Sequence, residues 1–154
     1  MTTTFEELLA RDGRLVYKTR GTSMEPMLRQ NRALVIIRSP AARLQQYDVA
    51  LYKRGNMYVL HRVIGVEKDR YLIRGDNTFA VEHVPFDAVI GVLSGFQRKG
   101  KEIDVENRGY RLYVRIWCAL YPLRAMLVRC RRYAAGLARR AGILPALKKL
   151  LRRE

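Results

Sequence analysis

Cysteine is scarce in this sequence, and its scarcity excludes two kinds of small domain. The 154 residues include two cysteines, Cys118 and Cys130, both in the C-terminal third. Neither has a metal-ligand spacing, and two cysteines do not make a disulfide framework. We therefore expect two thiols on a helix and a protein whose chemistry needs no metal and no organic cofactor.

A long apolar run is also absent. A helix that spans a bilayer needs about 20 predominantly apolar residues, and the best candidate, 112–128, is interrupted by Arg115, Pro122 and Arg124. The first residues, MTTTFEE, lack the basic and apolar regions of a secretory signal. The sequence thus predicts a chain with no transmembrane helix and no signal peptide, either cytoplasmic or peripherally associated with a membrane.

Acidic residues are nearly missing from one end of the chain. The formal net charge is +16, but residues 1–107 carry 17 Lys/Arg against 13 Asp/Glu, whereas residues 108–154 carry 13 against one. The sequence therefore predicts two parts, a nearly balanced domain (1–107) and a basic tail (108–154). Such a tail usually binds anionic lipid, nucleic acid or an acidic partner.

Short β-rich segments dominate the first part. Apolar residues make up 49% of the chain, enough for a core. Threonine and glutamates at 4–9 predict a short helix. Runs separated by turns predict strands at 15–17, 33–37, 48–52, 57–64, 71–74, 89–96 and 102–105. This pattern predicts a mainly β domain, a small antiparallel barrel or folded sheet.

The periodicity changes at Tyr110. From there, apolar residues recur at intervals of three and four, which predicts a helical seam with the arginines mostly off it: 112, 116, 120, 123, 127, 130, 134, 137 and 141. Pro122 should kink this helix or open a second one. Gly142 should end it, and 145–153 could form one more short helix.

Three separated motifs carry residues that suit serine chemistry. Residues 21–28 read GTSMEPML, a turn that presents Ser23 between a glycine and a proline; 60–63 read LHRV, and 74–77 read RGDN. A serine hydroxyl needs a neighbouring base, and histidine titrates near neutral pH. Each motif alone is typical of an ordinary turn or a core histidine, but their combination in this order favours catalysis.

These motifs resemble those of signal peptidase I-type serine peptidases, in the Ser-His-Asp subtype of the endoplasmic reticulum and archaea. The likeness covers roughly residues 15–95 and implies a coiled β fold shared with the self-cleaving SOS repressors. It implies acyl transfer through Ser23, with His61 as general base. Lys53 is not expected to compete as the base, because it precedes the intervening turn.

The acid of the triad stays open between two carboxylates. Asp76 is the first candidate to orient His61 and stabilise its charged form. In the resembled subtype the acid lies a few residues beyond the Gly-Asp-Asn aspartate, where this chain has Glu82. Asp48, before a strand, is interpreted as structural, and His83 as a surface loop residue.

The serine turn should also provide the oxyanion site and part of the substrate groove. We assign these roles to Gly21, Thr22, Met24 and Pro26, with Met27 lining the groove or its floor. The resemblance implies cleavage of signal or leader peptides after small residues such as alanine. The substrate would thus be a peptide or a preprotein.

Family members usually carry a membrane helix ahead of the serine, and here only 22 residues, largely polar and without a long apolar run, precede it. The basic tail could replace that anchor by lying on an anionic membrane, with Tyr113, Trp117 and Tyr121 near its apolar side. Alternatively, the seam packs on the β domain.

A second function class is a catalytically inactive basic module that binds membrane, an acidic peptide or, less favoured, nucleic acid. SOS repressors fit less well, because they use lysine as base and carry an upstream DNA-binding domain.

Overall fold

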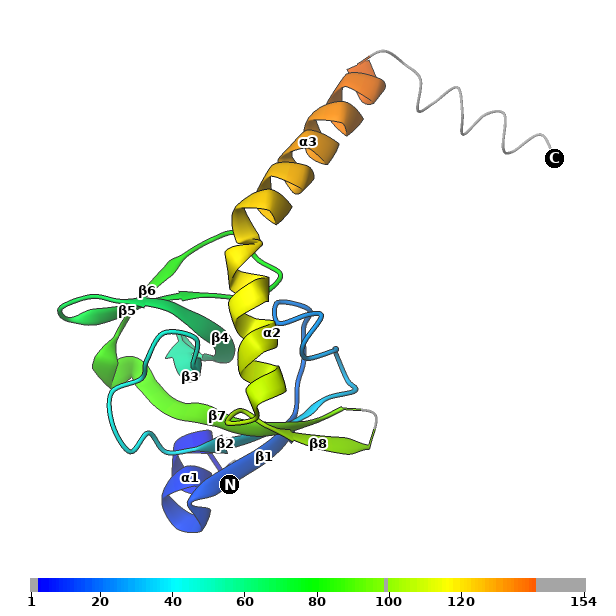
Figure 1. Cartoon of the computed structure of the whole chain (residues 1–154). Helices are drawn as coiled ribbons and strands as arrows, with labels where there is room; N and C mark the ends of the chain where they lie inside the picture. The colour runs from blue at the N-terminus through cyan, green and yellow to red at the C-terminus, as the bar shows by residue number, and fades with distance from the viewer. Residues whose placement is uncertain (1–2, 99, 141–154) are drawn as a thin grey trace. The chain divides into compact units, whose positions relative to one another are not determined.

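The computed structural model describes residues 3–98 and 100–140, which fall into two compact units, Met1–Arg115 and Ile116–Glu154. The first unit is mainly an antiparallel sheet of eight strands (Figure 1). The strands are β1 (Arg14–Lys18), β2 (Leu34–Arg38), β3 (Val49–Arg54), β4 (Met57–Val66), β5 (Arg70–Arg74), β6 (Glu82–Pro85), β7 (Val89–Arg98) and β8 (Lys101–Asp104). The helical segments are α1 (Phe5–Asp12), the 3-10 turn η1 (Phe86–Ala88), α2 (Arg108–Ala119) and α3 (Tyr121–Arg140).

The sheet is folded but not closed. Its strands follow the order β1-β2-β7-β3-β4-β5-β6, with β8 also paired to β7, so the path ends at β1 and at β6. The expected barrel is therefore wrong and the folded sheet is correct. Register shifts between Ile36 and Ile37, Leu51 and Tyr52, and Val63 and Gly65 interrupt the ladders. Such irregularities bend strands, which suits the curvature visible in Figure 1.

All seven predicted strands are present, because their β-branched and aromatic residues bury well on a pleated surface. The β3–β4 hairpin turns at Gly55, whose φ of 59° lies in the left-handed region. Strand β6 was not predicted. It contains only four residues, one of which is Pro85, and it pairs at the edge with β5. The prediction that His83 lies in a loop is therefore wrong, because His83 belongs to β6. Its side chain is exposed, as predicted.

Two hydrophobic clusters support the sheet. The larger contains Leu15, Val35, Ile37, Val49 and Leu51, together with apolar residues of the serine turn. The smaller is built on β3, β4 and β5, with Tyr52, Val63, Tyr71 and Ile73 at its centre. Consecutive buried residues in β3 and in β4 show that both faces of these two strands are covered.

Helix α1 begins as predicted from its threonine. Thr4 and Glu7 form a reciprocal capping box, and Gly13 ends the helix with φ of 66°. The Tyr58 hydroxyl on β4 donates a hydrogen bond to Glu6 at 2.5 Å, which ties the helix to the sheet. The predicted N-terminal helix is confirmed.

The first turns of α2 belong to the β unit. Val114 is buried, and Tyr110 and Tyr113 pack against the larger cluster. The predicted boundary after residue 107 therefore lies eight residues before the end of the first compact unit at Arg115. The face of α2 that packs is not the predicted seam, because Leu112 on that seam is 60% exposed.

The second unit is described by itself over Ile116–Arg140. The predicted break at Pro122 is confirmed, since α2 ends at Ala119 and α3 begins at Tyr121. The Arg124 guanidinium lies 3.6 Å from the centre of the Trp117 ring. Five residues of the predicted seam in this unit are about half exposed: Ile116, Leu120, Leu123, Leu127 and Leu137. The predicted stop at Gly142 and the helix at 145–153 lie outside the described residues.

Within residues 3–98 and 100–140, no helix is both long enough and apolar enough to cross a membrane.

Candidate active site

The serine turn follows β1 and is anchored by its own apolar residues. Leu28 donates its backbone N–H to the Met24 carbonyl at 2.9 Å, and Met24, Met27 and Leu28 are all buried in the larger cluster. Gly21 has φ of 85°, which favours glycine. Burying three apolar side chains fixes the loop, and Ser23 is left half-buried at its surface.

The turn after β5 holds the serine turn from the other side. The Asn77 backbone N–H donates to the Ser23 carbonyl at 2.7 Å, and the Asn77 side-chain amide donates to the Thr22 carbonyl at 3.2 Å. These two bonds join residues far apart in sequence. They bring the first and third predicted motifs into contact.

Gly75 is the point at which all three motifs meet. A Cβ added to Gly75 would lie 2.7 Å from the Ser23 carbonyl oxygen and 3.1 Å from His61 Nε2. No real side chain is tolerated at such separations from a backbone oxygen. The absence of a side chain at Gly75 therefore leaves room for the serine turn and for His61 Nε2, which both lie beside this glycine.

His61 lies on β4 and is 6% exposed. Its Nδ1 atom lies 3.1 Å from Glu82 Oε1 on β6 and 3.2 Å from the Tyr52 hydroxyl on β3. One ring nitrogen thus faces a carboxylate, and the other lies beside Gly75, which also contacts the serine turn. A general base in a serine triad needs a carboxylate at one nitrogen and the serine at the other.

Burial sets the charge state of His61. Loss of solvation lowers the pKa of the imidazole from its ordinary value of 6.5, and the Arg54 guanidinium lowers it further, while the carboxylate of Glu82 and its hydrogen bond act in the opposite direction. The net direction is downward. The ring is therefore neutral at pH 7 and available to accept a proton.

Asp76 forms an ion pair with Arg62. Both of its carboxylate oxygens accept from Arg62, at 2.8 Å from Nε and 2.7 Å from Nη2. The two side chains are 1% and 3% exposed, so this is a buried bidentate ion pair. Arg62 also donates to the Tyr47 carbonyl and the Tyr110 hydroxyl. The carboxylate that faces His61 Nδ1 is Glu82.

The other predicted residues of the serine turn occupy different depths. Gly21 and Thr22 are exposed, Pro26 is half-buried, and Met24 is 5% exposed. The Thr22 carbonyl accepts from the Glu25 N–H as well as from Asn77. Met24 therefore lies beneath the turn, in the core, and Gly21 and Thr22 lie at its surface.

Sequence analysis did not identify Tyr52 and Arg54 as part of the site. The Arg54 guanidinium lies 3.3 Å and 3.2 Å from the two Glu82 oxygens. Tyr52 and Arg54 lie on β3, which pairs with β4. Glu82 comes close to this part of the sheet because β6 pairs with β5. Alternation along β3 places 52 and 54 on one face of the strand, which was the available signal. Lys53, on the other face, pairs with Glu6 at 3.6 Å.

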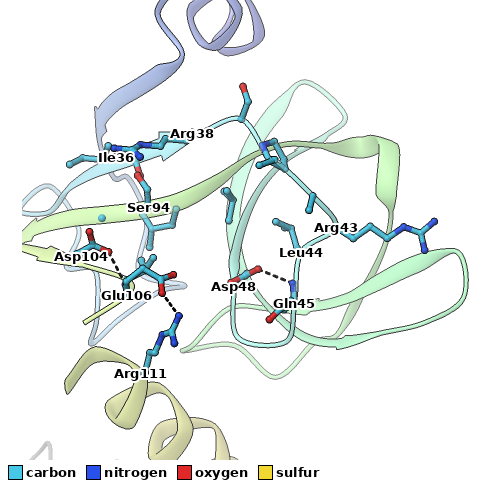
Figure 2. Close-up of a pocket in the computed structure, with 18 of the residues that line it drawn as sticks. Ile36, Arg38, Arg43, Leu44, Gln45, Asp48, Ser94, Asp104, Glu106 and Arg111 are labelled. Carbon is cyan, nitrogen blue, oxygen red and sulfur yellow. Dashed lines mark hydrogen bonds and ion pairs between the residues drawn. The ribbon is translucent and has the colours of Figure 1, made fainter. Parts of the chain in front are cut away.

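A polar hollow lies elsewhere on the first unit, between the 38–48 segment, β7, β8 and α2 (Figure 2). Three of its carboxylates have partners within the hollow. Asp48 accepts from the Gln45 N–H at 2.8 Å, Asp104 accepts from the Glu106 N–H at 2.7 Å, and Glu106 pairs with Arg111. Asp48 thus has the structural role predicted for it, and the pocket contains none of the triad residues.

Among the residues that the structure describes, no group of three or more His, Cys, Asp or Glu side chains has an arrangement that could hold a metal ion. Cys118 on α2 is half-buried and Cys130 on α3 is exposed, and neither forms a disulfide.

Neither the protein-family models nor the curated proteins compared with this sequence include a match.

Proposed function

We propose that this chain is a serine endopeptidase that cleaves signal or leader peptides through an acyl-enzyme on Ser23. The observation that carries the proposal is the orientation of His61, with Nδ1 facing the Glu82 carboxylate and Nε2 beside the serine turn at Gly75. The lowered pKa of His61 supplies a neutral base at pH 7. Resemblance of the three motifs to signal peptidase I-type enzymes supports the same assignment.

The proposed reaction has two halves. Ser23 Oγ attacks the scissile carbonyl while His61 Nε2 takes its proton, and the resulting imidazolium is stabilised by Glu82. His61 then returns the proton to the leaving amine as the C–N bond breaks. In the second half a water molecule, deprotonated by His61, attacks the ester carbonyl, and His61 returns the proton to Ser23 Oγ as the ester C–O bond breaks and the acid product leaves. Backbone N–H groups of the serine turn would bind the oxyanion.

Substrate preference follows from the surface beside Ser23. Under this proposal the side chain before the cleaved bond lies against Gly21 and Thr22, with Met24 and Pro26 beneath and beside it. We propose that this position prefers small residues such as alanine, as the resemblance to signal peptidase I-type enzymes implies. Asp76 has no role in proton transfer here, and the acid of the triad is Glu82.

The proposal is tested with a serine-directed acylating probe and intact-mass measurement. We expect one adduct on the wild type and none on Ser23→Ala or His61→Ala. The matched control is Ser39→Ala, because Ser39 is an exposed serine in another part of the first unit. An adduct that survives Ser23→Ala, or no adduct on folded wild type, would contradict the proposal.

A second candidate function uses the basic helices. The described part of the tail exposes apolar side chains along α2 and α3, among them Leu120, Leu123 and Leu127, and residues 108–140 contain arginine but no acidic residue. An exposed apolar seam with cationic flanks favours an anionic membrane surface over a purely ionic partner. We propose that this surface attaches the peptidase to such a membrane.

Sedimentation with vesicles tests this attachment. We expect binding to vesicles containing anionic lipid, weaker binding to neutral vesicles, and loss of binding in the double variant Leu120→Asp/Leu127→Asp. Met57→Asp is the control, because Met57 is a similarly exposed apolar residue on β4. Binding that high salt abolishes and that the double variant does not change would instead indicate an acidic peptide or nucleic acid.

A further inference from the structure

Two oxygen atoms compete for one nitrogen of the candidate base. His61 Nδ1 lies 3.1 Å from Glu82 Oε1 and 3.2 Å from the Tyr52 hydroxyl. An ionised carboxylate only accepts hydrogen bonds, whereas a tyrosine hydroxyl both donates and accepts. A neutral imidazole carries its hydrogen on one nitrogen, so the partner of Nδ1 determines what remains at Nε2.

With Glu82 ionised, Nδ1 must carry the hydrogen to bond its carboxylate. Nε2 is then an unprotonated acceptor on the serine side. The Tyr52 hydroxyl can then no longer donate to Nδ1. Burial first and the Glu82 carboxylate second raise the pKa of Tyr52. Tyr52 therefore remains a protonated donor at neutral pH.

Without the carboxylate the preference reverses. The Tyr52 hydroxyl is 3.2 Å from Nδ1 and would donate to it, which moves the ring hydrogen to Nε2. In that tautomer the nitrogen beside Ser23 has no lone pair to accept the serine proton. The tyrosine then opposes catalysis instead of supporting it.

We infer that Tyr52 is a positioning residue which, together with the charge on Glu82, sets the ring tautomer of His61. Its catalytic meaning rests on the proposed function, but the tautomer itself does not. Tyr52 is 2% exposed and belongs to the smaller core cluster, so its hydroxyl has a fixed place. Arg54 completes the arrangement, because its guanidinium contacts both oxygens of Glu82.

The direct test is nitrogen NMR of the histidine rings in the full chain. The sequence has two histidines, and His83 is exposed, which makes it an internal reference that His83→Gln assigns. At pH values above the pKa of His61, we expect the ring hydrogen on Nδ1 in the wild type and in Tyr52→Phe. In Glu82→Ala we expect it on Nε2. Nδ1–H retained in Glu82→Ala, or Nε2–H in the wild type, would overturn the inference.

Rates give an independent test, because the effect of Tyr52→Phe should change sign. Measured as probe acylation of Ser23, Tyr52→Phe alone should slow the wild type by about fivefold, the value of one net hydrogen bond. In the Glu82→Ala background the same change should accelerate acylation by about fivefold, because the competing donor is removed. Slowing by a similar factor in both backgrounds would contradict the inference.

The two kinds of failure are distinguishable. If no serine is acylated but the tautomers change as expected, the inference holds and the proposed peptidase activity fails. If Ser23 is acylated and the tautomer of His61 does not respond to Glu82→Ala, the activity stands and the positioning role of Tyr52 is wrong.

Discussion

Two arginine–carboxylate pairs lie near the candidate base. They differ in how deeply they are buried and in whether the carboxylate also contacts His61 Nδ1. Arg62 and Asp76 are 1% and 3% exposed, and the guanidinium occupies both carboxylate oxygens. Arg54 and Glu82 are 53% and 23% exposed, and Glu82 still accepts at His61 Nδ1. The buried pair joins β4 to the turn after β5, whereas the more open pair contacts the His61 ring through Glu82.

This difference shows why sequence order does not identify the acid of a triad. An aspartate buried against arginine is held by strong bidentate hydrogen bonds, and its removal leaves a charge without compensation. A carboxylate at the protein surface costs less to desolvate and can be oriented by weaker contacts. The comparison predicts that the Asp76 region controls stability and the Glu82 region controls activity.

The largest effect is expected from breaking the buried pair. Asp76→Asn leaves Arg62 buried and charged, so the free energy of unfolding should fall by about 3–5 kcal/mol, measured by urea denaturation. Asp69→Asn is the control, because Asp69 pairs with Arg70 at the surface and should change little. Arg62→Met combined with Asp76→Leu should be less destabilising than Asp76→Asn alone. A small loss for Asp76→Asn would refute the structural role.

Replacing the other carboxylate should reverse this pattern. Glu82→Gln removes the charge that stabilises the imidazolium, so acylation of Ser23 should slow by about a hundredfold or more. Because the Arg54 guanidinium is 53% exposed and can be hydrated when Glu82 loses its charge, the unfolding free energy should change by less than about 1 kcal/mol. The acylation rate and the urea midpoint are measured on the same preparation. A rate equal to wild type would return the assignment of the acid to Asp76.

Gly75→Ala tests the contact between the motifs. The new Cβ would lie 2.7 Å from the Ser23 carbonyl oxygen, so the serine turn must move away from His61. Misplacement of this size should slow acylation by about a hundredfold. Gly136→Ala is the control, since a Cβ there meets nothing within 4 Å. If both variants acylate like the wild type, the close approach at Gly75 is not needed.

The pH dependence of stability reports the burial of His61. Its folded pKa is lowered, so the unfolded chain binds a proton more readily than the folded one. Stability from the neutral ring is complete above about pH 6.5 and is lost as the pH falls through the lower folded pKa. His61→Gln should remove this part of the slope in urea titrations, and His83→Gln should not. The acylation rate should likewise decrease as the pH falls below about 6.5 and the His61 ring gains a proton.

The smallest effect is expected at the exposed arginine. Arg54→Gln should change the unfolding free energy by no more than about 1 kcal/mol, because its pair with Glu82 is solvated. It should raise the pKa of His61, since the guanidinium lowers it. An NMR titration of the His61 ring measures this directly. A downward shift would mean that Arg54 acts mainly by holding Glu82 in place.

Local signals predicted most of the secondary structure correctly. The Thr4–Glu7 capping box, the β-branched run of β2 and the break at Pro122 depend on neighbours in sequence. Strand β6 was missed because its four residues carry little pattern and it forms only by pairing with β5. The barrel was wrong because closure depends on register shifts that no single strand encodes.

By itself, the sequence determined which side chains are available: one serine in a tight turn, one histidine on a strand, and two carboxylates after it. Only the tertiary structure decided their partners. Arg62 follows His61 directly, so alternation along β4 sends the two side chains to opposite faces, and each face meets a different carboxylate. Pairing of β6 with β5 then brings Glu82 to the ring, while burial commits Asp76 to Arg62.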